Sequence, residues 1–301
     1  MSIDVTMDAP LAPEAAMEVP LMRRFYWSLR RELWEYRSLY LVPLGMSALV
    51  LIGSLIGLVT LPDKLRAATA LDPVQQQLHI QQPYAFAALL LMGSTFLVAV
   101  FYCLDTLYGE RRDRSILFWK SLPVSDVTTV LAKASIPIIF LPVVTLLVTV
   151  ATWVIMFLLA SVRLAGTGLS VGLHLSFAQM SATLFYHLIL GHGLWYAPIW
   201  GWLLFCSAWA KRVPFLWATL PLLAVGLVEK IAFNTSHFAN WIGYRFMTGP
   251  DNAPHRESAM VMITSATPAQ FLTSPGLWVG LALAAGLLLL AVRLRREHGP
   301  I

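Results

Sequence analysis

The sequence predicts an all-α polytopic membrane protein with six transmembrane helices, on the basis of its composition, its apolar runs and its basic residues. Of the 301 residues, 58% are hydrophobic and only 12% are charged, and the mean hydropathy is +0.69. Soluble domains carry about 25% charged residues. The net charge of +5 does not indicate a nucleic-acid partner, because membrane proteins concentrate Lys and Arg in cytoplasmic loops. Cys103 and Cys206 both lie in apolar runs, which argues against a disulfide framework.

Six apolar runs are long enough to span a bilayer, which takes about 20 residues. They are 39–61, 84–108, 134–160, 175–210, 214–233 and 275–293. The fourth run is too long for a simple span, since as one helix it would measure about 52 Å. Gly191–Gly193 and Pro198 are candidate breaks in it. One long or broken helix and a pair of short spans are therefore both open at this point.

The basic residues favour six spans with both termini in the cytoplasm. This topology places fifteen of the 21 Lys and Arg residues inside: Arg23, Arg24, Arg30, Arg31, Arg37, Arg111, Arg112, Arg114, Lys120, Lys133, Lys211, Arg212, Arg293, Arg295 and Arg296. Six lie outside or at a span end: Lys64, Arg66, Arg163, Lys230, Arg245 and Arg256. A seventh span would leave 10 inside and 11 outside, which removes the expected positive-inside bias.

Two segments precede the first span. Residues 1–20 carry acidic side chains and no Lys or Arg, so we expect a disordered acidic tail and not a signal peptide. Residues 21–38 predict an amphipathic helix, with apolar side chains at helical spacing and arginines elsewhere. Such a helix lies in the interface among membrane lipids. The alternative is a plain extension of the first span.

The remaining membrane-external segments are short. Residues 62–83 are polar and Gln-rich, and 234–274 form an outer segment whose apolar flanks suggest short interfacial or re-entrant helices. Neither is long enough for a separate globular domain. Residues 294–301 are expected to be a cytoplasmic tail that follows the six-span domain of 39–293.

No catalytic or metal site is predicted. The chain lacks the G-x-x-x-x-G-K-[ST] run that binds nucleotide phosphates, so it is not expected to be an enzyme by itself or to bind a cofactor. His187 and His192 are five residues apart, which places them on different faces of a helix. They have no obvious serine partner, and no acidic residue near them suggests a metal ligand.

Two further groups of residues are candidates for weaker roles. Glu229 and Lys230 stand at the outer end of the fifth run, and ionisable residues in spans are candidates for a substrate path; a position near the interface, where Lys reaches water, is the simpler reading. Two small-residue pairs have the spacing of helix–helix contacts. These pairs are Gly53 with Gly57, and Gly276 with Gly280, which continues to Ala284.

The stretch GERRDRSILFWKSLPVSDVTTVLAK, residues 109–133, combines charge, aromatic residues and a proline between two spans. We expect the second span to continue as helix to about Lys120 and to end at Pro123, which disfavours helix at Leu122. Ser125 is placed to cap a new helix that begins near Asp126. The result is a cytoplasmic elbow with Phe118, Trp119 and Leu122 near its tip; an ordinary basic loop is the alternative.

This stretch resembles the signature of ABC type 2 exporter permeases, the membrane subunits of ATP-binding cassette transporters. In that family a Glu-Arg pair follows the second span, then Leu-Pro with a small polar residue, then a Lys at the third span. Glu110 and Arg111, the run Leu122 to Ser125, and Lys133 are similar to this pattern. The resemblance extends to the interfacial helix, the six spans and the long outer segment; the extended fourth run departs from it.

The resemblance implies an exporter subunit in a bacterial inner membrane. It implies a dimer with a second or related permease, and a separate ATP-binding cassette subunit that binds the ATP. The elbow would be the coupling helix docked on that ATPase, with Phe118, Trp119, Leu122, Pro123 and Ser125 at the contact. Arg111, Arg112, Arg114 and Lys120 would be rim charges beside Glu110. The alternative function is a non-ABC membrane protein, such as a secondary transporter or an assembly factor.

Overall fold

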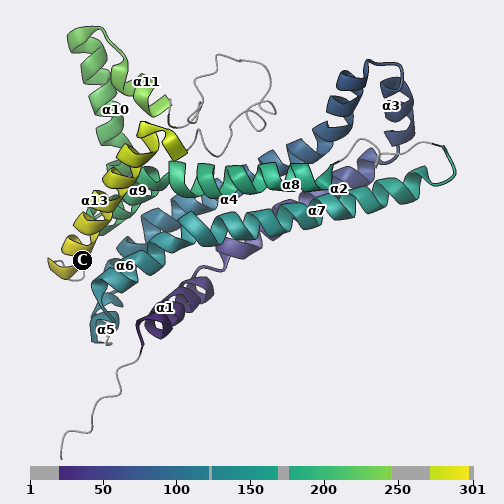
Figure 1. Cartoon of the computed structure of the whole chain (residues 1–301). Coiled ribbons are helices and arrows are strands. Elements are labelled where there is room, and N and C mark those ends of the chain that lie inside the picture. Colours follow the sequence, from purple (N-terminus) through teal and green to yellow (C-terminus); the bar gives the residue numbers. More distant parts are fainter. Residues whose placement is uncertain (1–19, 122–123, 169–175, 244, 246–271, 298–301) are drawn as a thin grey trace, which may run out of the picture.

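The computed structural model describes residues 20–121, 124–168, 176–243, 245 and 272–297. Within these ranges the secondary structure is helical, with no strand. Figure 1 shows an elongated bundle with a short helical hairpin projecting at each end, α10–α11 at one and the α3 turn at the other. The acidic tail at 1–19 and most of the outer segment, 246–271, lie outside the described residues, so the predictions made for them stay predictions.

The helices follow the chain in a simple order. Before the elbow come α1 (Leu21–Glu35), α2 (Ser38–Gly57), α3 (Leu61–Ala68) and α4 (Pro73–Arg112). The elbow and third span comprise α5 (Ile116–Ser121), α6 (Asp126–Ser135), the π-helix η1 (Ile136–Phe140) and α7 (Leu141–Leu164). Then follow α8 (Phe177–Tyr186), the π-helix η3 (His187–Trp195), α9 (Ala197–Trp209), α10 (Pro214–Phe233), α11 (His237–Gly243) and α13 (Pro275–Glu297).

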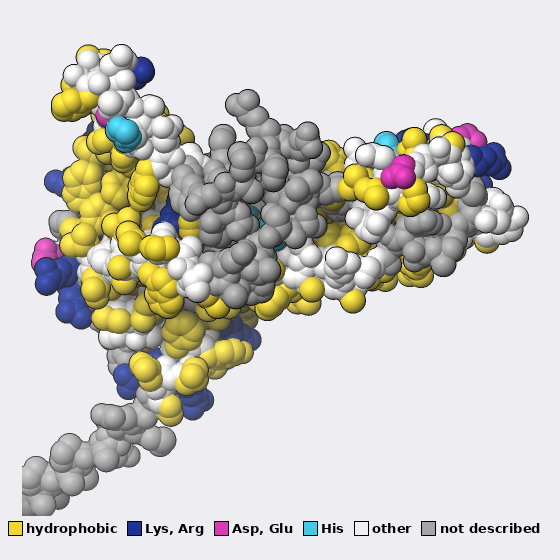
Figure 2. All heavy atoms as spheres, turned by 45° about the horizontal axis from the view of Figure 1, so that its top comes forward, with side chains coloured by type: hydrophobic (Ala, Val, Ile, Leu, Met, Phe, Trp, Pro, Cys, Tyr) yellow, Lys and Arg dark blue, Asp and Glu magenta, His cyan; other side chains and the backbone are white. Residues whose placement is uncertain are grey.

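Five helices are long and apolar enough to cross a membrane, or six if the bent pair of α8–η3 and α9 counts as one span. The two parts of that pair meet at 46°, and the bend falls at Tyr196, just before Pro198 in the first turn of α9. Pro198 cannot donate to the preceding turn, which favours a bend there. Figure 2 shows hydrophobic side chains over much of the molecule and charged side chains gathered toward its ends.

The packing of the described residues favours one bent span over two short ones. The Arg111 side chain, at the C-terminal end of α4, donates to the carbonyl oxygens of Ser207 and Ala210 at the C-terminal end of α9. Lys120 donates to the carbonyl of Arg296 near the end of α13, at 3.3 Å. The C-terminal ends of α4, α9 and α13 therefore lie together, at what we call the basal end. A single bent span brings α9 there, whereas two spans would return α9 to the opposite end.

The core is built around α4, which packs against α2, α7 and α9. As a 40-residue helix it is about 60 Å long, twice the thickness of a hydrocarbon core. Helices α9 and α13 make the most intimate pair. A Cβ added to Gly201 would lie 3.2 Å from the Ala284 carbonyl oxygen, so the missing side chain lets the two backbones approach.

The two π-helical segments pack against each other inside the bundle. A Cβ at Gly193 of η3 would lie only 2.7 Å from the carbonyl oxygen of Ile138 in η1. Pro137 stands at the start of η1, and a proline removes one backbone donor from the helical ladder. The wider turns of a π-helix accommodate this interruption.

One expectation about a helix end is wrong, and two helices extend beyond the predicted spans. The Gln-rich segment after Asp72 forms the first turns of α4, capped where the Asp72 carboxylate accepts from the Val74 amide at 3.3 Å. The second span does not continue as helix to Lys120: it ends at Arg112, and Arg114 has a φ of +58°, a left-handed conformation that an α-helix cannot contain. Helix α13 extends to Glu297, so the first part of the expected tail is helical.

Candidate functional site

A cluster of buried and half-buried charges joins four helices at the basal end. Its members are Arg31 and Glu32 of α1, Glu110 of α4, Asp126 and Lys133 of α6, and Arg295 of α13. We call this set the basal ion cluster. It contains equal numbers of basic and acidic side chains, so the burial of charge is balanced within it. Buried charges in proteins are expected to be paired in this way.

Lys133 is the centre of the cluster and is 1% exposed. Its ammonium lies 2.8 Å from the Glu32 carboxylate and 3.1 Å from that of Glu110. It also donates to the Thr106 hydroxyl at 2.7 Å. Its third hydrogen bond goes to the Thr106 carbonyl oxygen, at 3.2 Å. The bonds to Glu32 and to the two Thr106 oxygens use the three protons of the ammonium, and Glu110 adds an ion pair.

The two glutamates are held by further donors. Arg31 contacts Glu32 at 2.5 Å and Glu110 at 2.7 Å, and Arg295 forms an ion pair with the other oxygen of Glu110. The second Glu32 oxygen accepts from the Tyr102 hydroxyl at 2.9 Å and from the Thr106 hydroxyl at 3.1 Å. Each of the two buried carboxylates is therefore paired with several hydrogen-bond or ion-pair donors.

The electrostatics of Glu32 follow from this environment. Burial disfavours the charged carboxylate and would raise its pKa, but the charges of Lys133 and Arg31 outweigh this effect, and the pKa is lowered. Glu32 is therefore ionised at neutral pH. Glu35, one turn further along α1, shows the opposite: its pKa is raised, first by burial and then by the negative charge of Glu32.

The elbow is attached to this cluster. Ser125 caps α6 by accepting from the Thr128 amide at 3.1 Å, which confirms the predicted start of that helix at Asp126. The Asp126 carboxylate accepts from Arg295 at 3.0 Å. On α5 the Trp119 ring lies under the Arg31 guanidinium, 4.0 Å from the ring centre. The elbow thus contacts α1 and α13 through ionic and cation–π contacts.

The tip of α5 is different in character. Leu117 is 59% exposed and Phe118 is 60% exposed, and the Phe118 ring stacks edge-on against Trp119 with centroids 4.9 Å apart. Trp119 itself is half-buried. Leu122 and Pro123 lie outside the described residues, so their predicted place at the contact is untested.

The expected rim charges divide into two groups. Arg112, Arg114 and Lys120 are exposed, and Arg112 forms an ion pair with Asp113 at 2.9 Å. Arg111 departs from the expectation: it is 4% exposed and bonds the last carbonyls of α9. Its side chain is used within the chain because helix ends leave carbonyls that need donors.

The sequence did not reveal Glu32. It lies three residues after Leu29 and four before Tyr36, so it occupies the apolar face of α1, where a charge is costly without a partner. That position was the available signal. Its partners come from α4 and α6, far along the chain, and only the packed structure shows them.

Glu229 and Lys230, the candidates for a substrate path, lie away from the basal ion cluster. The Glu229 carboxylate accepts from the backbone amides of His237 and Phe238, at 2.7 and 2.8 Å. It therefore caps the start of α11, a structural role. Lys230 is exposed.

The glycine pairs have different surroundings. A Cβ at Gly53 or Gly57 would meet no atom within 4 Å, so these glycines make no close helix contact within the described chain. On α13 the Gly276 carbonyl accepts from the Arg245 guanidinium at 3.1 Å. A Cβ at Gly280 would collide with that same guanidinium, so this pair accommodates an arginine side chain.

Gly168–Gly172 reads G-L-S-V-G and matches the G-x-S-x-G pattern of serine hydrolases. That pattern acts as a nucleophile elbow between a strand and a helix, whereas here it follows helix α7. Its serine, Ser170, lies outside the described residues. The run therefore carries no catalytic assignment.

Comparisons with protein-family models, with curated proteins and with solved structures find no match to this chain.

Proposed function

We propose that this chain is the transmembrane permease subunit of an ATP-driven ABC exporter, which forms the substrate path and is driven by a separate ATP-binding cassette subunit. The observation that carries the proposal is an exposed apolar tip, Leu117 and Phe118, on an elbow that the basal ion cluster fixes to α1 and α13. Exposed aromatic and aliphatic side chains beside a polar rim are typical of protein-binding anchors.

The signature residues support this proposal by their contacts. Glu110, Arg111 and Lys133, the residues that resemble the permease signature, are all buried and bond other helices. Glu110 and Lys133 bond each other directly, 3.1 Å apart. A family signature made of such residues has a physical reason. Changing Glu110 or Lys133 would leave a buried charge without its partner, and changing Arg111 would leave the carbonyls at the end of α9 without a donor.

The geometry suggests how force would pass from the ATPase to the membrane. A displacement of the elbow would be transmitted from α5 to α1 through Trp119 and Arg31, and from α6 to α13 through Asp126 and Arg295. Closure of two ATPase subunits on ATP would move the elbows of two permease copies. Only contacts that differ between the open and closed states can shift the equilibrium between them.

Localisation follows as part of the same proposal. The basal end holds the elbow, so it would face the cytoplasm of a bacterial inner membrane, with both termini inside. In that orientation α1 carries Trp27 and Trp34, which are 50% and 70% exposed and stack with Arg30. Tryptophan and arginine are typical of helices that lie in the membrane interface.

Co-purification with the ATP-binding cassette protein of the chain's own gene neighbourhood tests the proposal. Phe118→Ala and Trp119→Ala should each weaken assembly by roughly 2 kcal/mol or more, about thirtyfold, as interface anchors do. Arg112→Ala should cost less and depend more on salt. Phe233→Ala is the control, since this phenylalanine is 73% exposed and lies at the C-terminal end of α10, away from the elbow.

Two outcomes of the co-purification would count against the proposal. One is that the wild-type chain captures no ATP-binding cassette subunit. The other is that the tip variants keep full ATPase binding; if in addition Trp119→Ala loses membrane yield, its ring serves the fold through Arg31. Robust ATP hydrolysis by the isolated chain would also contradict the division of labour.

A further inference from the structure

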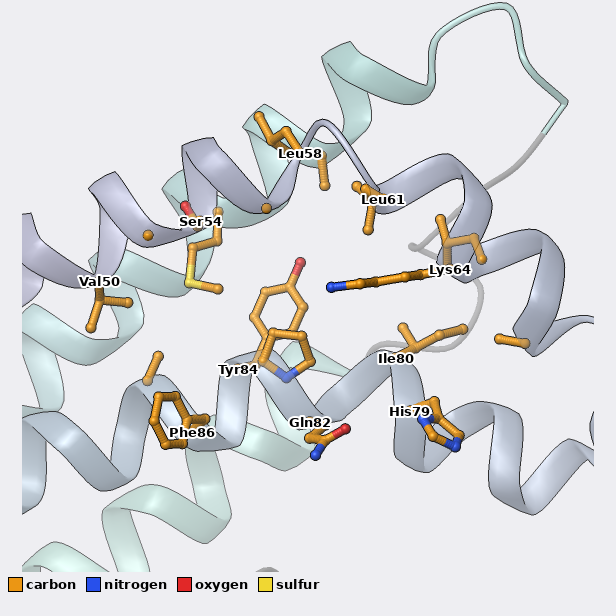
Figure 3. Close-up of a pocket in the computed structure, with 18 of the residues that line it drawn as sticks. Val50, Ser54, Leu58, Leu61, Lys64, His79, Ile80, Gln82, Tyr84 and Phe86 are labelled. Carbon is orange, nitrogen blue, oxygen red and sulfur yellow. The ribbon is translucent and has the colours of Figure 1, made fainter.

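A large cavity lies at the end of the molecule opposite to the basal ion cluster. Its volume is about 1040 Å³, at the upper end of the range for ligand pockets of about 300–1,000 Å³. It is lined by residues of α2, α3, α4 and α7 and is partly open to the surface (Figure 3). Its wall is mainly apolar, with Val50, Leu58, Leu61, Ile80 and Phe86 among the lining side chains.

Small residues on α2 make this space. Gly53 and Gly57 both line the cavity, and a Cβ at either would meet no atom within 4 Å. The small-residue pair that the sequence offered as a helix contact therefore opens a cavity instead. An apolar cavity of this size has no polar partners for ordered water over most of its wall, and it suits an apolar ligand.

One end of the cavity carries a positive charge. The Lys64 side chain extends into the space toward Tyr84, and Gln82 and His79 lie on the α4 side (Figure 3). The neighbouring Asp63 pairs with Arg66 at 3.4 Å. Within the described residues no carboxylate lies at ion-pair distance from the Lys64 ammonium. A lysine at a membrane boundary usually extends toward water. Lys64 is exposed, and its ammonium reaches the mouth of the cavity, where it can pair with an anionic group.

The cavity lies in the membrane leaflet opposite the elbow. Tyr84 of the cavity and Glu110 of the basal ion cluster are 26 residues apart on α4, about 39 Å along the helix axis. The hydrocarbon core measures about 30 Å. Lys64 therefore lies near the outer headgroup level when the basal end lies at the cytoplasmic surface.

We infer that this cavity binds a long-chain amphiphile with an anionic headgroup, the apolar chain between α2 and α4 and the headgroup at Lys64. The inference rests on the cavity and its charge, and it stands whether or not the chain docks an ATPase. A lipid of the outer leaflet and a free anionic amphiphile share this chemistry. Both present a phosphate or carboxylate to an ammonium, with a hydrocarbon chain behind it.

Native mass spectrometry of the delipidated full-length chain with dodecyl phosphate tests the inference. All titrations use one detergent concentration, so that partition into micelles is equal for each variant. We expect a saturable single adduct for the wild type. Lys64→Gln should weaken binding about tenfold, since a charged hydrogen bond is lost. Arg66→Gln, on the same helix turn but outside the cavity wall, should leave binding unchanged.

A second pair of variants tests the apolar part. Gly53→Phe fills the cavity and should abolish the adduct. Gly45→Phe is the matched control, because Gly45 lies on the same helix in open space and does not line the cavity. Equal binding in these two variants would overturn the assignment of the site.

The headgroup and the source of the ligand have separate arms. In dodecylphosphocholine the choline cation balances the charge of the phosphate. This compound should bind more weakly than dodecyl phosphate, and Lys64→Gln should lower its affinity only slightly. If inorganic phosphate bound as tightly as dodecyl phosphate, a role for the ligand's hydrocarbon chain in binding would be refuted. If phosphatidylglycerol co-purifies with the wild type and not with Gly53→Phe, the occupant is a bilayer lipid. If a free fatty acid displaces dodecyl phosphate and phosphatidylglycerol does not, the occupant is a soluble amphiphile.

Discussion

Replacing Lys133 by an uncharged residue should destabilise the protein more than the same replacement at any other described lysine. Lys133→Met keeps the length of the side chain but deletes the contacts to Glu32 at 2.8 Å, Glu110 at 3.1 Å and Thr106 at 2.7 Å. Two carboxylates then share the remaining arginines. Breaking a buried ion pair by removing one partner costs about 3–5 kcal/mol.

Thermal unfolding of the detergent-solubilised chain measures this loss. Cys103 and Cys206 are both free and fully buried, so a thiol-reactive fluorescent dye reports the temperature at which the core opens. At about 2 °C per kcal/mol for a chain of this size, the midpoint should fall by about 6–10 °C. Lys120→Met, the same change on an exposed lysine, should shift it by no more than about 2 °C.

A double variant separates charge from packing. Glu32→Gln with Lys133→Met removes one charge of each sign, so it should recover at least half of the loss of the single variant. Equal midpoints for Lys133→Met and Lys120→Met would refute the view that the basal ion cluster holds the helices together. So would a double variant that is less stable than the sum of its two single changes.

Three other predictions follow from the described residues. The pKa of Glu32 is lowered in the folded protein, so its contribution to stability is fully present above the ordinary glutamate value of 4.5 and is lost as the pH falls through the folded value. In Glu32→Gln the unfolding midpoint should therefore fall less steeply on the acid side than in the wild type. In a cysteine-free background, Asp63→Cys should react with a membrane-impermeant thiol reagent in intact cells and Arg296→Cys should not; both side chains are exposed, at 80% and 59%, so labelling at the second site would reverse the topology. Gly193→Ala should lower the unfolding midpoint, because its Cβ would press on a backbone carbonyl of η1, whereas Gly191→Ala has open space; equal midpoints would remove the close π-helix contact from the account.

The hydrophobic pattern was enough to predict most of the spans. The fifth predicted run, 214–233, coincides with α10, and the sixth begins with α13 at Pro275. The start of α6 at Ser125 was also predictable, because capping depends on residues close in sequence. The bend near Pro198 follows from the same local rules.

Tertiary contacts determined what the sequence could not show. Hydropathy marks where a helix enters the membrane but not where it ends, so the extension of α4 to Pro73 was missed. The left-handed turn at Arg114 could not be predicted, because no glycine or proline stands at that position. Arg111 has the same local character as Arg112, yet α9 buries the first and leaves the second exposed. Only the packing of distant helices makes that difference.

The central claim, that the tip of α5 is the surface on which an ATPase docks, is tested most directly by site-specific photo-crosslinking in membranes. A photoreactive residue at Leu117, which is 59% exposed, should form a covalent adduct with the ATP-binding cassette subunit. The same residue at Val162, 77% exposed at the far end of α7, should form none. An adduct of equal yield at both positions, or none at Leu117 when the two proteins are co-expressed, would contradict the account.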